Sequence, residues 1–398
     1  MLDSGSTRLV VLLASVLKPV DDTRMQGKFA QTLRERSGTE VHIAGRSPSA
    51  AAPAPGVGIV HHPIFSGSRL SAARLLAQWR YWRLLHRLRP AVVVVHAPEL
   101  LPLTLLWQRL SRGRRFIYDI RENYALNVST QNVYQGLTRR FLAKGLRWVE
   151  TRAARQAAAL TLAEESYASE LPFLQALPNN RVVVLENKHQ PAPGEALPCA
   201  PRPLPGPDKL LRLLYSGTIS NLNGVQHAVE LAEALNKIRP GGALLTVIGF
   251  CQQPALLERL KGWELRGRPF RMIGGATTVP HAEIVAEIGR SHLGVALYLP
   301  HPSTARCRPT KLFEYLAHGL PVIIPENPLW ASLVRNHDAG LTLNFGKIDY
   351  PAAARHILAS LAERAARAPP GFYRQGLPTD VRWETEGKKL WRLLDSLD

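Results

Sequence analysis

The stretch Arg308–Pro325 reads RPTKLFEYLAHGLPVIIP and predicts a short helix followed directly by a buried strand. Pro309 suits the first turn of a helix, because proline has no backbone N–H to leave unpaired there. Gly319 suits the position that ends a helix, and the apolar run after it is typical of a strand covered on both faces. One helix–strand unit of a parallel α/β sheet is therefore predicted here.

The same alternation of short apolar runs and longer helical patterns extends along the chain on both sides of this unit. It is typical of doubly wound parallel sheets, in which crossover helices connect the strands. The predicted strands are Leu9–Leu17, Val41–Ala44, Val57–Val60, Ala91–Val95 and Phe116–Ile120, then LRLLYSG, LLTVIG, FRMIG, LGVALYL and PVIIP. The predicted helices cover 23–36, 69–88, 100–111, 132–158, 224–238, 254–261, 281–290 and 310–318. The fold class is thus α/β, with two Rossmann-like domains.

A proline-rich stretch divides the chain. Residues 188–209 hold seven prolines and almost no periodicity, which favours an extended linker. We therefore expect a first domain over 1–187 and a second over 210–380. Residues 381–398 predict a final helix, and the sequence leaves open whether it packs back on the first domain. Because ligands of such sheets bind beyond the carboxyl ends of the strands, the site is expected in a central cleft that both domains face.

The composition restricts the partners and the compartment. Lysine and arginine exceed aspartate and glutamate by 19, which favours an anionic partner such as nucleic acid, an acidic bilayer face or a phosphorylated substrate. Three widely spaced cysteines, Cys199, Cys251 and Cys307, give neither a disulfide framework nor a metal-binding spacing, which suits a reducing compartment. No apolar run is long enough to cross a bilayer. A cytoplasmic protein is expected.

The helix that starts near Pro309 offers a site for phosphate groups. Its first N–H groups, at Lys311 and Leu312, are expected to point out of a helix end that carries partial positive charge, and the Lys311 side chain adds a full charge. Glu314 follows one turn later, where its carboxylate can accept hydrogen bonds from ribose hydroxyls. The spacing alone favours a second interpretation, in which Lys311 and Glu314 form an exposed i,i+3 ion pair.

PTKLFEYLAHGLPVI closely resembles the donor-site segment of family 4-like glycosyltransferases of the two-domain GT-B fold. Other segments are similar to the family's in the expected order. These are VHAPELLPLTLLWQRL and RRFIYDIRENY in the first half, and LLYSGTISNLNGVQHAVELAEAL, LLTVIG and FRMIGGATTVPHAEIVAEIGRSHLGVALYLP in the second. The resemblance covers roughly residues 8–345. It implies two facing Rossmann-like domains and a nucleotide diphosphate sugar as donor substrate.

The resemblance also assigns roles to particular residues. It implies that Glu314 holds the nucleotide ribose. Lys311 and the backbone near Thr310 and Leu312 would hold the diphosphate. Gly217 and Thr218 would lie in the loop beside the phosphates, where glycine permits close approach of the backbone.

On the first domain, the resemblance places three residues in the cleft, at the end of a strand. Asp119, Arg121 and Glu122 are the catalytic candidates, and an inverting reaction would use Asp119 or Glu122 as the base. Either acid could instead be a structural partner at the strand end. The resemblance favours retention of anomeric configuration, and catalysis without a metal or another cofactor is expected.

The sequence departs from the family pattern at the sugar-contacting end. Arg306 stands where many members have a second glutamate, and Arg121 stands where the family has a histidine. We interpret Arg121, Arg306 and Arg308 as cationic partners of the diphosphate or of a negatively charged sugar, because guanidinium groups bind phosphate and carboxylate in bidentate fashion. The alternative is that they are solvated surface arginines.

Two helical patterns combine arginines with apolar and aromatic residues. RLSAARLLAQWRYWRLLHRLR covers Arg69–Arg89, and a second such pattern covers Arg139–Arg155. Interfacial membrane helices have this composition, although scaffold helices that pack on a sheet can share it. Peripheral contact with the anionic inner face of the cell membrane is the favoured interpretation. Nucleic acid is not expected as a partner, because no helix-turn-helix, zinc or RNA-binding motif is present.

The sequence therefore predicts a glycosyltransferase that moves a sugar from a nucleotide diphosphate sugar to a glycan or lipid-linked acceptor. Capsule, exopolysaccharide or lipopolysaccharide assembly is the expected setting. Two alternatives remain. One is a sugar-nucleotide epimerase or hydrolase on the same fold, and the other is a catalytically weakened nucleotide-sugar-binding partner.

Overall fold

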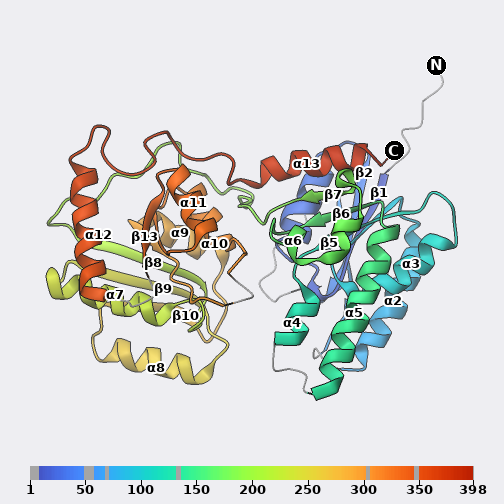
Figure 1. Ribbon diagram of the computed structural model, residues 1–398, viewed down its shortest axis with the longest axis horizontal. Coiled ribbons are helices and arrows are strands. Elements are labelled where there is room, and N and C mark those ends of the chain that lie inside the picture. Colours follow the sequence, from blue (N-terminus) through green and yellow to red (C-terminus); the bar gives the residue numbers. More distant parts are fainter. Residues whose placement is uncertain are drawn as a thin grey trace. The chain divides into compact units, whose positions relative to one another are not determined.

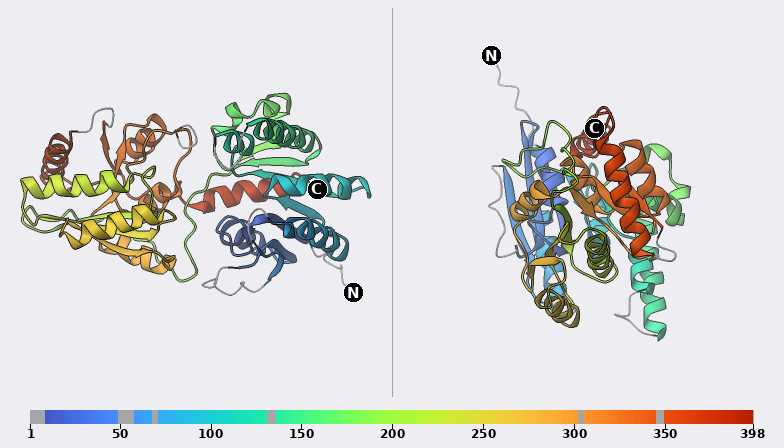
Figure 2. Two further views of the ribbon diagram at one scale, coloured as in Figure 1. Left: turned by 90° about the horizontal axis from the view of Figure 1, so that it is seen from below. Right: turned by 90° about the vertical axis from the view of Figure 1, so that its left-hand side faces the viewer.

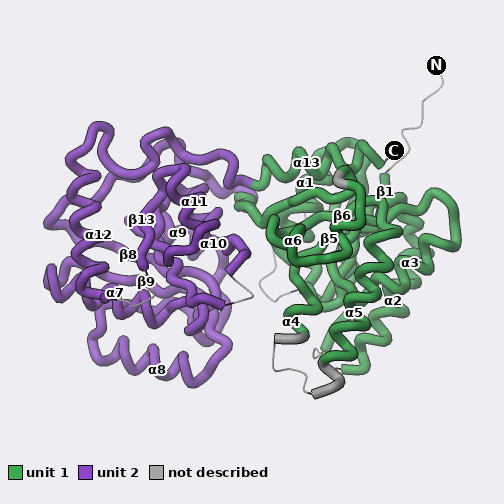
Figure 3. Tube along the Cα trace, viewed as in Figure 1, with its two compact units in different colours: residues 1–192, 383–398 green, residues 193–382 purple. Residues whose placement is uncertain are grey.

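The computed structural model describes residues 9–48, 58–67, 71–130, 136–301, 305–344 and 349–397. The chain forms two compact units (Figure 3). Unit 1 comprises residues 1–192 and 383–398, and unit 2 comprises residues 193–382. The first crossing between them falls within the proline-rich stretch 188–209.

Unit 1 contains, in its described residues, a seven-stranded parallel sheet of order β3-β2-β1-β4-β5-β6-β7. Its strands are β1 (Leu9–Pro19), β2 (Thr39–Arg46), β3 (Ile59–Phe65), β4 (Val92–Val95), β5 (Arg115–Ile120), β6 (Ala159–Leu162) and β7 (Val182–Val184). Its helices are α1 (Gln31–Arg34), α2 (Ala73–Leu88), α3 (Leu101–Arg109), α4 (Tyr124–Thr130), α5 (Gly136–Gln156), α6 (Tyr167–Glu170) and α13 (Trp383–Asp395). Short helical turns are η1 (Met25–Ala30), η2 (Pro98–Leu100), η3 (Pro172–Ala176) and η4 (Asn179–Arg181).

Unit 2 repeats this architecture with a six-stranded parallel sheet of order β10-β9-β8-β11-β12-β13 in its described residues. Its strands are β8 (Leu211–Thr218), β9 (Ala243–Phe250), β10 (Phe270–Gly275), β11 (Leu293–Val295), β12 (Val322–Pro325) and β13 (Gly340–Leu343). Its helices are α7 (Val225–Ile238), α8 (Pro254–Leu265), α9 (His281–Arg290), α10 (Thr310–Ala317), α11 (Pro328–Asn336) and α12 (Tyr350–Ala365). Figures 1 and 2 show helices on both faces of each sheet, so both units are doubly wound, as predicted.

The last helix, α13, belongs to the core of unit 1. Trp383, Leu390, Leu393 and Leu394 pack among the apolar side chains that β1, β2 and η1 bury. The Trp383 indole N–H also donates to the Thr32 hydroxyl at 2.9 Å. The chain therefore returns to its first unit after completing the second.

Several elements differ from the sequence prediction. The helix predicted over 23–36 begins as the π-helical turn η1 and continues as the four-residue α1. The strands β6, β7 and β13, and the helices α4, α6, α11 and α12, were not predicted. These strands have only three or four residues, too few for an apolar run to distinguish a strand from a helix.

Parts of three predicted elements, Val57, residues 69–70 and residues 132–135, lie outside the described residues. Among the helices that are described, none has the length and apolar character needed to span a membrane.

Candidate functional site

In unit 2, the end of β8 and the start of α10 meet above the sheet. β8 ends at Gly217 and Thr218, and Gly217 has a φ of +92° that favours glycine. A Cβ atom at Gly217 would lie 3.9 Å from Cε of Lys311. The structure thus brings Gly217 and Lys311 together as the sequence predicts, and Thr218 beside them is exposed.

Lys311 is buried, and its ammonium nitrogen has no hydrogen-bond partner among the described residues. It lies over two aromatic rings instead, 4.3 Å from the centroid of Tyr215 and 5.1 Å from that of Tyr298. Burial lowers the pKa of Lys311 to about 7, although the neighbouring Glu314 carboxylate acts in the opposite direction. Aromatic faces compensate a buried cation only in part. An anionic ligand would supply the missing partner.

The N-terminus of α10 lies beside this lysine. Pro309 is the N-cap residue, and no side chain caps the helix. The prediction for Leu312 needs correction, because its N–H already donates to the Pro309 carbonyl at 2.9 Å and its side chain is buried in the core. Thr310 and Lys311 make no such backbone bond among the described residues, so their N–H groups are the ones left for a phosphate.

Glu314 lies one turn further along α10 and is mostly buried. Its Oε1 atom accepts from Nε2 of His281, the first residue of α9, at 2.6 Å. No pairing of Glu314 with Lys311 is present among the described residues, so the exposed i,i+3 pair is not formed. Arg306 is exposed and Arg308 is half-buried.

In unit 1, Asp119 is fully buried at the end of β5, where three side chains donate hydrogen bonds to its carboxylate. Its two oxygens accept from Nε and Nη2 of Arg24 at 2.8 and 2.7 Å, from Nδ1 of His96 at 2.7 Å and from the Thr161 hydroxyl at 2.6 Å. Burial alone would raise the pKa of Asp119, but Arg24 and His96 lower it below its usual range. These contacts favour a structural role for Asp119, and its role as a catalytic base stays a prediction.

Arg121 also has a partner within unit 1. Its guanidinium donates to both carboxylate oxygens of Asp22, at 2.8 and 3.1 Å, and both side chains are nearly buried. Burial would lower the pKa of Arg121, but Asp22 raises it. Asp22 thus occupies the bidentate face of Arg121, and the role of Arg121 toward the substrate stays a prediction.

Glu122 is the remaining acid at this strand end. Its side chain is 40% exposed and lies 3.3 Å from Nζ of Lys18. It is the one of the three predicted catalytic residues that solvent reaches freely.

Sequence reasoning missed the partners of these residues. His96 and His281 lie in segments that resemble the family, whereas Arg24 and Asp22 lie outside the quoted segments. No local pattern pairs any of them with the residue it contacts, which is 95 residues away for Arg24 and Asp119 and 23 for His96 and Asp119.

Residues 24–188 match the model of the glycosyl transferase 4-like domain family. The chain therefore contains a glycosyl transferase 4-like domain, which makes it a glycosyltransferase. The matched region lies within unit 1 and ends before the chain crosses into unit 2. No curated protein gives a significant match to this glycosyltransferase.

Solved structures share the fold over nearly the whole chain. A sucrose-phosphate synthase from Thermosynechococcus elongatus matches with a TM-score of 0.65 and 15% identity, covering 98% of this chain and 99% of that one. WaaG, a glycosyltransferase involved in lipopolysaccharide biosynthesis, matches with a TM-score of 0.61 and 15% identity over 96% and 94%. HepE of Anabaena, in complex with UDP-glucose, matches with a TM-score of 0.61 and 13% identity over 98% and 100%. This glycosyltransferase therefore has the two-domain GT-B fold.

Proposed function

We propose that this glycosyltransferase transfers a sugar from a nucleotide diphosphate sugar to a glycan or lipid-linked acceptor in surface polysaccharide assembly, with retention of anomeric configuration. Unit 2 would bind the donor. Lys311 and the N–H groups of Thr310 and Lys311 would contact the diphosphate, Gly217 would allow its close approach, and Glu314 would accept from the ribose.

The observation that carries this proposal is the buried ammonium of Lys311, which has no hydrogen-bond partner in the described part of the chain. A protein interior tolerates such a group poorly. The group lies next to a glycine at a strand end and an uncapped helix N-terminus, where anions are favoured. As the donor's bond to the sugar breaks, this positive field would stabilise the charge that develops on the leaving diphosphate.

Two further observations support the finer parts of the proposal. WaaG is described as involved in lipopolysaccharide biosynthesis, which supports a surface polysaccharide as product. An inverting reaction needs a carboxylate base, and because four hydrogen bonds engage Asp119, the exposed Glu122 is the candidate left for that role. Turnover that survives Glu122→Gln would support retention, and the anomeric configuration of the first product, read by NMR, tests it directly.

Thermal-shift measurements with UDP-, GDP-, dTDP- and CMP-linked sugars test the donor site. UDP-glucose is the first choice, because HepE binds it. A ligand that binds only the folded protein raises the melting temperature by mass action. We expect one nucleotide sugar to stabilise the wild type and to have no effect on Lys311→Met and Glu314→Ala. Equal stabilisation of wild type and both variants would contradict the site. Release of free nucleotide without an acceptor would favour the hydrolase alternative.

We also propose that unit 1 contacts an anionic membrane through an apolar-basic surface on α2, α3 and α5. Helix α3 touches both of the others (Figure 1). The apolar-basic surface consists of the exposed apolar residues Leu75, Leu76, Trp79, Leu106, Leu110, Phe141, Leu142 and Trp148 and the exposed basic residues Arg80, Arg83, Arg87, Arg109, Arg140, Lys144 and Arg152. Trp79, Phe141 and Trp148 are 53%, 72% and 68% exposed, respectively.

The charge of this surface favours a lipid over a protein of mixed charge. Helices α2 and α3 contain no aspartate or glutamate, and the one acid of α5, Glu150, is buried and accepts from the Tyr118 hydroxyl. Exposed aromatic side chains surrounded by arginine suit the boundary between lipid headgroups and acyl chains. A lipid-linked acceptor would be reached at the same surface of the membrane.

Flotation with phosphatidylcholine vesicles, with and without phosphatidylglycerol, tests the membrane contact. We expect binding only to the anionic vesicles, and a loss of roughly ten-fold or more in the Trp79→Ser/Phe141→Ser/Trp148→Ser variant. Leu265→Ser is the matched control, because Leu265 is 89% exposed but lies on α8 in unit 2. Equal binding of the triple variant would contradict the contact. Binding of a single-stranded oligonucleotide that the triple variant loses would favour nucleic acid instead.

A further inference from the structure

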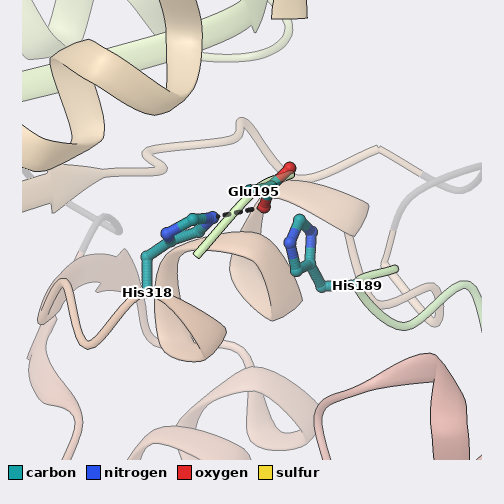
Figure 4. Close-up of side chains that lie close together, drawn as sticks. All are labelled: His189, Glu195 and His318. Atoms are coloured by element: carbon teal, nitrogen blue, oxygen red, sulfur yellow. Dashed lines mark hydrogen bonds and ion pairs between the residues drawn. The ribbon is translucent and has the colours of Figure 1, made fainter. Parts of the chain in front are cut away.

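His281 connects the predicted ribose-binding carboxylate to a second acidic residue. Its Nε2 atom lies 2.6 Å from Oε1 of Glu314, and its Nδ1 atom lies 3.8 Å from Oε2 of Glu195. The other Glu195 oxygen is 2.9 Å from Nε2 of His318 (Figure 4). His318 follows α10 directly, and its N–H donates to the Glu314 carbonyl at 3.1 Å. A chain of four titratable side chains therefore connects the start of α9 with the end of α10.

The charges around His281 favour its protonated form. The hydrogen bond to Glu314 raises the pKa of His281, against a smaller opposing effect of burial, and Glu195 raises it further. Two groups of charges surround the pair of His281 and Glu314. Glu195, which contacts His318, lies near His281, and Lys311 lies near Glu314. A protonated imidazole has two N–H groups, so His281 can donate a hydrogen bond to Glu314 while its positive charge attracts the Glu195 carboxylate 3.8 Å away.

The geometry around Glu314 leaves one oxygen for a ligand. His281 occupies Oε1, whereas Oε2 has no partner among the described residues. A carboxylate whose first oxygen is fixed by a charged donor loses less rotamer freedom when its second oxygen binds a ligand. His281 itself is 47% exposed, so its place is held by these two carboxylates and not by packing alone.

We propose that His281 is a positioning residue for donor binding: it fixes Oε1 of Glu314 so that Oε2 accepts from the ribose hydroxyls of the nucleotide. This rests on the proposed donor-binding function of unit 2. His281 does not touch the sugar that is transferred. Its loss should therefore raise KM for the donor and leave kcat nearly unchanged.

Calorimetric titration of UDP and GDP, and of their 2′,3′-dideoxy counterparts, tests this role. His281→Ala should weaken binding of the ribose nucleotide about ten-fold or more, the range of a hydrogen bond to a charged group. It should leave binding of the dideoxy nucleotide and of pyrophosphate unchanged. His281→Gln keeps an N–H donor and should restore most of the affinity. His337→Ala is the matched control, because His337 pairs with Asp380 elsewhere in unit 2.

The pH dependence gives a second readout that a purely structural role would not produce. Wild-type affinity should fall as pH rises through the pKa of His281, and His281→Gln should lack this component. Lys311 titrates in both proteins, so the difference between the two profiles isolates His281.

The outcomes separate the two proposals. If His281→Ala loses affinity equally for the ribose and the dideoxy nucleotides, or for neither, the role of His281 is wrong. The donor site itself still stands in that case, provided that Lys311→Met abolishes binding. If the wild type binds neither nucleotide, or Lys311→Met binds as well as wild type, the donor site itself is wrong and this inference fails with it.

Discussion

Units 1 and 2 each bury a charged side chain near the end of a central strand, but only one of these charges has its partners. Asp119 at the end of β5 accepts four hydrogen bonds from three residues. Lys311, under the end of β8, has no hydrogen-bond acceptor among the described residues. A buried charge with every partner in place supports the fold, whereas one without a partner indicates where a ligand completes the structure. We therefore propose that Asp119 stabilises the fold and that Lys311 binds a ligand.

The largest expected change in stability comes from a substitution of Asp119 in unit 1. Asp119→Asn removes the charge that compensates the buried Arg24 guanidinium, and we expect it to destabilise the protein by about 3–5 kcal/mol. Chemical denaturation of the purified variant measures this loss. If Asp119→Asn is as stable as wild type but has lost turnover, Asp119 is a catalytic residue, and the contrast between Asp119 and Lys311 is wrong.

Lys311→Met should have the opposite effect on stability. Methionine fits between Tyr215 and Tyr298 without burying a charge, so the donor-free variant should be more stable than wild type by about 1–3 kcal/mol. The same variant should lose donor binding. Denaturation without ligand measures the first effect, and a destabilised Lys311→Met would mean that the two aromatic rings already satisfy the ammonium.

The lowered pKa of Lys311 also predicts how stability depends on pH. Between about pH 7 and the unfolded value of about 10.4, the unfolded chain holds a proton that the folded protein has lost. Stability of the donor-free wild type should therefore rise with pH in this window, relative to Lys311→Met, by up to about 1.4 kcal/mol per pH unit. Donor affinity should fall over the same range, because the diphosphate favours the charged lysine. If the stability of wild type and of Lys311→Met depends on pH in the same way, the Lys311 ammonium is not buried without a partner.

The smallest stability effect is expected at Glu122. Its pair with Lys18 is solvated on both sides, so Glu122→Gln should change stability by less than about 0.5 kcal/mol. Activity measured on the same variant then has a clear meaning. A large fall in turnover would make Glu122 the functional acid of unit 1, and unchanged turnover would leave the reaction to groups on the donor side.

The elements that could be predicted from the sequence are those with long or strongly patterned segments. The runs at β1, β4 and β12 are apolar at nearly every position, which is typical of a strand covered on both faces. The short strands β6, β7 and β13 pair correctly only because neighbouring strands provide their hydrogen-bond partners, and this information is not local. The helix α10 was predicted from its proline, its apolar face and its glycine, yet the engagement of the Leu312 N–H depends on how the first turn closes.

The sequence by itself determined that the chain forms parallel α/β sheets and contains a lysine and a glutamate at a helix N-terminus, and that two helices combine arginine with aromatic residues. These properties follow from local patterns, since periodicity, helix-ending residues and composition act over a few residues at a time. Only the tertiary structure decided which charges are satisfied. Arg121 pairs with Asp22, 99 residues away, and Glu314 pairs with His281, 33 residues away. The ammonium of Lys311 lies over aromatic rings and has no hydrogen-bond partner among the described residues. The physical reason is that the cost of a buried charge depends on what surrounds it in space, and folding alone determines those surroundings.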